Sequence, residues 1–146
     1  MFIQTSRFGE IEVQEKDMIT FVSPVLGFAN LKKYVIINAL ENSLFQYMQS
    51  LEDKDLTFVL ADPFQWFPDY EFELERRWLQ KLKLKSKKDV DIWAITTLRS
   101  SSDISINLKA PIVINTKSNE AAQIILEGLD YPTRYSLIDN RQEEMR

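Results

Sequence analysis

Four carboxylates stand close together in the sequence, at Asp62, Asp69, Glu71 and Glu73. Two carboxyl groups that converge in a cleft could act as general acid and nucleophile in glycoside hydrolysis. The same acids alternate with aromatic residues, however, as the solvated face of a strand would. Metal ligation is no better supported, because the chain has no D-x-D-x-D-G pattern and its nearby prolines fix the spacing badly for a loop site. We therefore expect these acids to lie on a surface.

Histidine and cysteine are both absent from the 146 residues. Their absence removes the commonest general base, the commonest zinc ligand and every Ser/His or Cys/His dyad, so only carboxylate, lysine or tyrosine chemistry remains. With three glycines in all, the chain also has no Gly-rich phosphate loop. These observations favour a protein that is not an enzyme, has no catalytic residues and needs neither a metal nor another cofactor.

The residues between the acids are largely aromatic, since the stretch DPFQWFPDYEFEL, residues 62–74, carries five rings. Two prolines interrupt the stretch, so one regular element with a single buried face is not expected and some rings should reach the surface. Exposed aromatic side chains are common anchors of protein interfaces. We therefore predict a partner-binding surface in this stretch. Its predicted residues are Phe64, Trp66, Phe67, Asp69 and Tyr70.

Directly after the aromatic stretch the chain becomes basic, with seven Lys or Arg residues and no acid in residues 76–88. A single-stranded RNA-binding barrel could use such a basic helix, with rings stacking on bases and lysines following the phosphates. Alternatively, Trp78 and Leu82 cover the core and leave the charges of the helix in solvent. The net charge of −4 and the acids around the rings favour the second interpretation, because both repel phosphate. We expect no direct binding of nucleic acid.

Period-2 alternation dominates the rest of the chain and predicts short strands. Ile104–Ile114 is predicted to be one long, half-buried strand, bent where Pro111 cannot donate to a ladder. A helix is predicted over about residues 74–84, where Trp78 and Leu82 lie four apart. Residues 120–126 fit a helix or a closing strand, and we favour the strand. Further strands are predicted at Phe2–Thr5, Met18–Val22, Lys33–Asn38 and Phe45–Ser50, and around residues 10–13, 56–60 and 90–98.

The pattern as a whole predicts a mainly β protein, a single-domain antiparallel barrel-like fold over residues 1–146 with one short helix. The 45% apolar composition fills one core without disulfides, and the polar residues 139–146 are predicted to be a frayed tail. No stretch approaches the roughly 20 apolar residues of a membrane-spanning helix. Residues 1–17 also lack the basic head and apolar run of an export signal. We expect a cytoplasmic protein that does not bind membranes.

Two blocks of the sequence resemble a known family. NLKAPIVIN, residues 107–115, and DPFQWFPDYEFEL, residues 62–74, are similar to the most recognisable blocks of the flagellar assembly factor FliW family. The resemblance continues in order through ITFVSPVLGF (19–28), LFQYMQS (44–50), VDIWAITT (90–97) and QIILEGLDYPTRYSL (123–137). The ordered series covers nearly the whole chain and is more specific than any one block.

The resemblance to the FliW family implies a β-rich, barrel-like, non-enzymatic protein of the bacterial cytoplasm that works by exchanging partners. It implies that the protein binds flagellin before export. When flagellin leaves the cell, the freed protein would capture the carbon storage regulator CsrA, an RNA-binding repressor of flagellin translation. Flagellin synthesis would thereby be matched to flagellin export.

Overall fold

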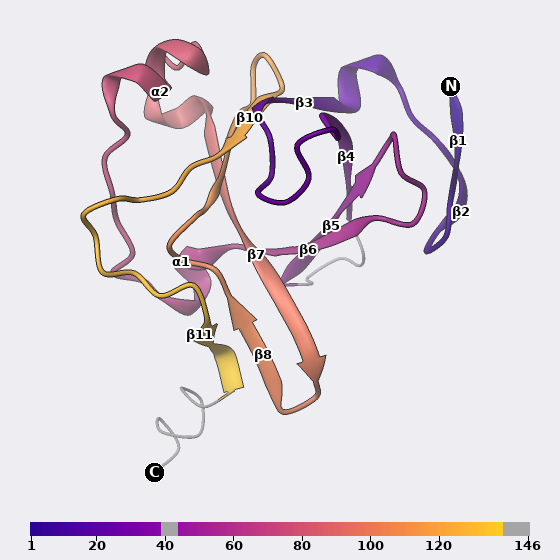
Figure 1. Ribbon diagram of the computed structural model, residues 1–146. Helices are drawn as coiled ribbons and strands as arrows, with labels where there is room; N and C mark the ends of the chain where they lie inside the picture. Colours follow the sequence, from indigo (N-terminus) through magenta and orange to yellow (C-terminus); the bar gives the residue numbers. More distant parts are fainter. Residues whose placement is uncertain (39–43, 139–146) are drawn as a thin grey trace.

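The computed structural model describes residues 1–38 and 44–138, and strands dominate this part of the chain (Figure 1). The strands are β1 (Phe2–Thr5), β2 (Gly9–Glu12), β3 (Met18–Ser23), β4 (Lys33–Asn38), β5 (Phe45–Ser50), β6 (Thr57–Ala61), β7 (Val90–Ser100), β8 (Asp103–Ile106), β9 (Ile112–Asn115), β10 (Glu120–Gln123) and β11 (Tyr135–Ser136). The helices are α1 (Pro63–Trp66) and α2 (Arg76–Lys81), with 3-10 turns η1 (Glu15–Asp17) and η2 (Lys87–Asp89). The predicted mainly β fold class is confirmed.

The main sheet has nine strands in the order β11-β8-β7-β6-β5-β4-β3-β10-β9, and all neighbours are antiparallel except β10 and β3. An additional pairing between β7 and β9 brings the far end of the sheet back to its middle, which makes the sheet barrel-like. β1 and β2 form a separate two-stranded hairpin. It is joined to the barrel by the bond from the Ser6 N–H to the Lys54 carbonyl and by the Phe8 ring packed on Tyr47.

β7 is the longest strand, with 11 residues, and it changes partners along its length. Val90–Trp93 pair with β9, the middle of the strand pairs with β6, and residues from Thr96 onward pair with β8. The pairing with β6 ends at Ala61 opposite Ala94. After Ala61 the chain leaves the sheet, so Val90–Trp93 of β7 have β9 on one side and, among the described residues, no strand on the other.

Two apolar cores lie on opposite sides of β6, β9 and β10, which explains why β9 is buried at every residue. The inner core, inside the barrel-like sheet, consists of Ile19, Phe21, Val25, Tyr34, Met48, Leu60, Ile112, Ile114 and Ala121. The outer core consists of Ala61, Tyr70, Leu82, Ala94, Ile106, Leu108, Val113, Ala122, Ile124, Leu126 and Leu137. Because adjacent strand residues point to opposite faces, the small side chains of Ala61, Ala94 and Ala122 face outward and let a covering layer approach closely.

Several predicted elements are confirmed. Phe2–Thr5, Lys33–Asn38 and Phe45–Ser50 are strands with the predicted bounds, and Glu120–Gln123 is the strand favoured over a helix. The helix predicted over about residues 74–84 is present but shorter, at Arg76–Lys81. The predicted tail, residues 139–146, lies outside the described residues.

Two predictions about elements are wrong. Ile104–Ile114 is not one strand, because residues 107–111 turn between β8 and β9. The Asn107 side chain accepts bonds from the Lys109 and Ala110 N–H groups, both at 3.0 Å, and this turn sends Leu108 and Ile112 into different cores. The prediction of a single short helix is also wrong, because a second helix, α1, forms within the aromatic stretch. The Asp62 side chain caps α1 by accepting from the Phe64 N–H at 3.0 Å, and Pro63 fits the first turn.

Candidate partner-binding surface

The aromatic stretch leaves the sheet after β6 and forms the layer that covers the outer core (Figure 1). It contains α1, a turn at Pro68 and Asp69, and residues 71–74, which are neither helical nor paired as a strand. α2 follows and ends in a turn where the Leu84 N–H donates to the Leu79 carbonyl at 2.8 Å. The chain then returns to the start of β7.

Tyr70, a predicted partner-binding residue, lies in the outer core with 2% of its surface exposed. Its hydroxyl donates to the Leu108 carbonyl at 2.7 Å, which ties the covering layer to the turn between β8 and β9. Burial raises the pKa of the Tyr70 hydroxyl above its usual value, and nearby Tyr131 adds to the shift. The ring is therefore structural and does not face solvent.

Phe67 is half-buried at the centre of an aromatic cluster. Its ring meets Tyr70, Tyr131 and Tyr135 edge-on, with centroids 6.4, 6.0 and 5.3 Å away. The Tyr131 hydroxyl donates to the Glu71 carbonyl at 2.8 Å and accepts from the Glu71 N–H at 3.0 Å. The two tyrosines at 131 and 135 come from a distant segment, so no local sequence pattern marked them as neighbours of the aromatic stretch.

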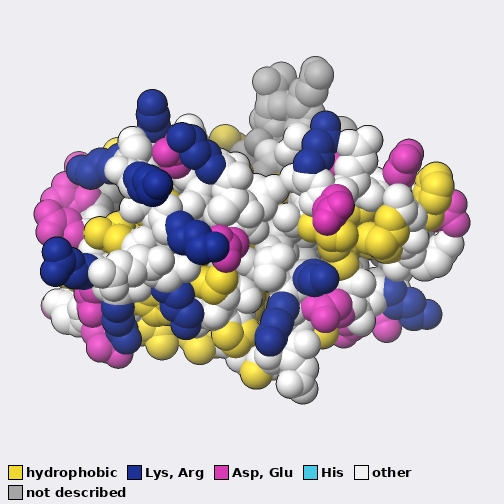
Figure 2. All heavy atoms as spheres, turned by 90° about the horizontal axis from the view of Figure 1, so that it is seen from above, with side chains coloured by type: hydrophobic (Ala, Val, Ile, Leu, Met, Phe, Trp, Pro, Cys, Tyr) yellow, Lys and Arg dark blue, Asp and Glu magenta, His cyan; other side chains and the backbone are white. Residues whose placement is uncertain are grey.

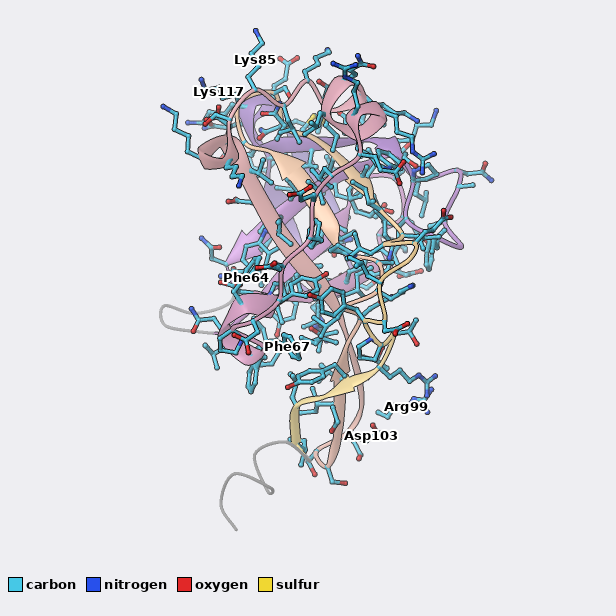
Figure 3. All side chains as sticks on the ribbon, turned by 90° about the vertical axis from the view of Figure 1, so that its left-hand side faces the viewer. Phe64, Phe67, Lys85, Arg99, Asp103 and Lys117 are labelled. Carbon is cyan, nitrogen blue, oxygen red and sulfur yellow. The ribbon has the colours of Figure 1, made fainter. Side chains whose placement is uncertain are left out.

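The other predicted residues differ in exposure. Trp66 is half-buried, packs against the outer core and lies 6.1 Å from the Phe45 ring. Phe64 is 40% exposed, and Asp69 is also exposed. Figure 3 shows Phe64 and Phe67 near α1, toward the same side of the molecule. Of the five predicted residues, Phe64 and Asp69 are therefore the most accessible to a partner.

A groove of about 890 Å³ opens beside the aromatic stretch. Its lining comes from four chain segments, residues 62–64, 70–74, 79–87 and 90–93, and includes Phe64, Phe72, Leu74, Leu79, Leu84, Val90, Ile92 and Trp93 among its apolar residues. The labelled side chains of Phe64 and Lys85 in Figure 3 belong to this lining and lie at different heights along β7. The volume falls within the range of roughly 300–1,000 Å³ that is usual for ligand sites.

Charged side chains of both signs line the groove, from different segments. The acids are Asp62, Glu71 and Glu73 of the aromatic stretch and Asp91 of β7, whereas the lysines are Lys85 and Lys87, between α2 and β7. The groove is therefore acidic along the aromatic stretch and at Asp91, and basic in the segment between α2 and β7. Groups of opposite sign on a partner would be attracted to each part.

The basic run lies mainly in solvent. Leu82 is buried and Trp78 packs against the outer core, so these two residues attach α2 to the protein as the second interpretation of the helix predicted. The Arg77 guanidinium and Lys81 ammonium lie over the Trp78 ring at 5.3 and 5.6 Å. Viewed from above in Figure 2, Lys and Arg side chains are spread over the half of the molecule that carries α2.

Two further findings concern the described residues. Residues 1–38 and 44–138 contain no group of three or more His, Cys, Asp or Glu side chains placed to hold a metal ion. In the same part of the chain, no helix is long and apolar enough to cross a membrane.

A family model, curated relatives and a solved structure all point to the same family. The family model described as "FliW protein" matches residues 2–137. The flagellar assembly factor FliW of Clostridium kluyveri is 41% identical over 138 residues, which cover 94% of this chain and 95% of that protein. The flagellar assembly factor FliW of Caldicellulosiruptor saccharolyticus is 39% identical over 139 residues, with 94% and 91% covered. A crystal structure of a flagellar assembly factor FliW superimposes with a TM-score of 0.87 at 36% identity, covering 94% of this chain and 96% of the other.

Proposed function

The chain belongs to the FliW family of flagellar assembly factors, and on this premise we propose that it binds flagellin before export and, when free, binds and antagonises the translational repressor CsrA. It acts in the cytoplasm as a binding protein without catalysis. Because the two partners compete, export of flagellin releases the protein to capture CsrA, and flagellin synthesis follows export. The family match over residues 2–137 is the observation that carries this proposal.

The charge distribution supports the CsrA half of the proposal. The chain carries a net charge of −4, and Asp69, Glu71 and Glu73 are exposed along the aromatic stretch. An acidic surface attracts a basic RNA-binding protein and repels the RNA that the same protein would otherwise hold, because the potentials are complementary to one and opposed to the other.

The test uses three purified proteins: this chain, flagellin and CsrA. We expect each partner to be retained by the immobilised chain, and we expect added flagellin to release bound CsrA. Retention of neither partner would contradict the proposed function. Retention of both at once, without competition, would contradict the exchange mechanism while leaving the two binding activities in place.

A second function, that of a single-stranded RNA-binding barrel, draws on one observation. Among the described residues, Lys85, Lys87 and Lys88 make no ion pair, whereas Lys83 pairs with Glu120 at 3.3 Å. Free cations beside exposed rings could follow a nucleic-acid backbone. The acids that surround those rings oppose this function, because they repel phosphate. Titration of the chain with a single-stranded RNA distinguishes this function from the proposed one.

A further inference from the structure

The first part of β7 presents a free strand edge. Val90–Trp93 bond to β9 on one side, whereas β6 on the other side ends opposite Ala94. In an antiparallel ladder, successive residues direct their backbone N–H and C=O groups alternately to the two sides, so every second residue of Val90–Trp93 directs both groups away from β9. Within the described part of the chain, no backbone hydrogen bond joins this side of Val90–Trp93 to another segment. Such an edge is a template for another strand.

The groove of about 890 Å³ described above runs along this edge, since Val90, Asp91, Ile92 and Trp93 all line it. Residues 71–74 of the aromatic stretch also line the groove without forming a strand. Tyr131 satisfies the backbone of Glu71, but no backbone bond within the described residues involves Phe72, Glu73 or Leu74. The groove is therefore bordered by backbone N–H and C=O groups that make no backbone hydrogen bond within the described residues.

The side chains of the groove define what it can hold. Val90, Ile92, Phe72, Leu74 and Leu84 supply apolar surface that continues into the outer core. Phe64 and Leu79, each 40% exposed, supply further apolar surface open to solvent. The four acids of the lining outnumber its two lysines. An occupant with apolar side chains and a basic character would thus match the groove better than an acidic one.

We infer that this groove binds an extended, apolar and basic segment of a partner protein, which adds as a strand to the free edge of Val90–Trp93. Main-chain hydrogen bonds would hold the segment, and its alternate side chains would enter the apolar lining. A helix would not use the edge, because its backbone groups bond internally. The inference rests on the proposed function only for the identity of the protein that supplies the segment.

The experiment uses the full chain and a synthetic probe, the capped peptide acetyl-Lys-Val-Lys-Ile-Lys-Val-Lys-amide. Two variants of the peptide carry N-methyl groups, one on the odd-numbered residues and one on the even-numbered residues. Calorimetry measures affinity, and amide hydrogen exchange measured by NMR locates the site. We expect saturable binding, slower exchange within residues 90–93, and a loss of about tenfold in affinity for at least one of the methylated peptides, the size expected for two lost hydrogen bonds.

Charge is tested in the protein. Glu73→Lys should weaken binding of the probe several-fold, because it reverses the charge of an exposed side chain of the lining. Asp103→Lys is the matched control, since this exposed acid belongs to the far end of the β7–β8 hairpin, well away from Lys85 in Figure 3. It should leave the affinity unchanged.

The inference is overturned if the probe does not bind, if residues 90–93 are not protected when it binds, or if both methylated peptides bind as well as the parent. Equal weakening by Glu73→Lys and Asp103→Lys would show attraction by net charge alone and would also overturn it. Failure of the proposed function looks different, because flagellin and CsrA would then fail to bind the chain whatever the probe does.

Discussion

Phe64 is the ring of the predicted surface that is most open to a partner. It is 40% exposed, and it packs on the buried Tyr70 ring with 5.6 Å between the ring centroids, which restricts its orientation. Truncating an aromatic anchor of an interface commonly costs about 2 kcal/mol or more, roughly thirtyfold in affinity. We therefore expect Phe64→Ala to weaken binding of flagellin or CsrA by about that factor while the melting temperature stays near that of the wild type.

The control for Phe64→Ala is Leu98→Ala, which truncates an apolar side chain that is 54% exposed in the second half of β7. Affinity and melting temperature are measured for both variants. If the two substitutions affect the partners equally, or if neither weakens them, the partner surface does not include Phe64. A large fall in melting temperature for Phe64→Ala would instead assign the ring to the core.

Tyr34 and Tyr70 form a matched pair for a prediction about pH and stability. Among the described residues, the buried Tyr34 hydroxyl has no hydrogen-bond partner, whereas the Tyr70 hydroxyl bonds to Leu108. Burial, with a smaller effect from Glu52 and Asp53, raises the pKa of Tyr34 from 10.0 to about 12. Ionisation of Tyr34 is harder in the folded state than in the unfolded state. The contribution of neutral Tyr34 to the free energy of unfolding is therefore fully present below pH 10, the unfolded pKa, and is lost as the pH rises toward 12, the folded pKa.

We expect Tyr34→Phe to be neutral or stabilising at pH 7, since it removes an unsatisfied buried polar atom, and to lessen the loss of stability above pH 10. Tyr70→Phe should cost about 1 kcal/mol at pH 7, because the Leu108 carbonyl loses its donor. Denaturant unfolding at pH 7 and at pH 10.5 or above gives both values. A larger loss at pH 7 for Tyr34→Phe than for Tyr70→Phe would contradict this account.

The composition of the candidate surface was only partly predictable at the level of residues. The concentration of rings in the aromatic stretch was evident, because local composition records it. Which ring faces solvent was not, because Tyr70 is buried by contacts with Leu108 and Tyr131 from remote parts of the chain. Burial set by long-range contacts leaves no periodic signal within thirteen residues interrupted by prolines.

The end of α2 offers a prediction at the scale of an element. Lys83 follows the helix with a φ of 56°, a left-handed conformation that glycine adopts at no steric cost. The Lys83 N–H bonds to the Gln80 carbonyl and the Leu84 N–H to the Leu79 carbonyl, as in a Schellman motif. This turn places Leu84 against the outer core and directs the chain toward β7.

We expect Lys83→Gly to stabilise the protein by up to about 1 kcal/mol, because it relieves the strain of a side chain in the left-handed region. The exposed ion pair between Lys83 and Glu120 contributes little, since such pairs are worth about 0–1 kcal/mol. Lys83→Ala removes the same ion pair without relieving the strain and serves as the control. The melting temperature should be higher for the glycine variant than for the wild type, and the alanine variant should melt at or below the wild type. A higher melting temperature for the alanine variant than for the glycine variant would contradict the assignment of strain to Lys83.

Strands were more predictable than turns. Lys33–Asn38 appears with the predicted bounds because Tyr34–Ile37 is a continuous run of aromatic and β-branched residues, and Phe45–Ser50 does so because Phe45 and Tyr47 alternate with glutamine. β8 and β9 were merged because apolar alternation continues through residues 107–111. The Asn107 side chain makes that turn, and two cores rather than one receive the apolar residues. A sequence pattern reports that a side chain is buried but not in which core.

At the scale of the whole molecule, charge is separated by segment. The basic run surrounds α2, which Trp78 and Leu82 fix to the outer core, while exposed acids follow the aromatic stretch. Lys85 and Lys87 line the same groove as Phe64 and Phe72. The free cations and the rings therefore meet in a groove that four acids also line. A barrel that binds single-stranded nucleic acid needs both along one path, whereas a protein that binds a basic repressor needs acids near its rings.

We therefore expect the protein to bind RNA weakly or not at all. A single-stranded flagellin leader RNA is titrated into the chain near 0.15 M salt, and the titration is repeated with Lys85, Lys87 and Lys88 replaced by Gln. Affinity weaker than about 10 µM, with little difference between the two proteins, is the expected result, because a net charge of −4 and the acids beside the rings repel phosphate. Sub-micromolar binding that falls steeply with salt and disappears in the triple variant would instead establish the basic run as a nucleic-acid surface and favour the RNA-binding function.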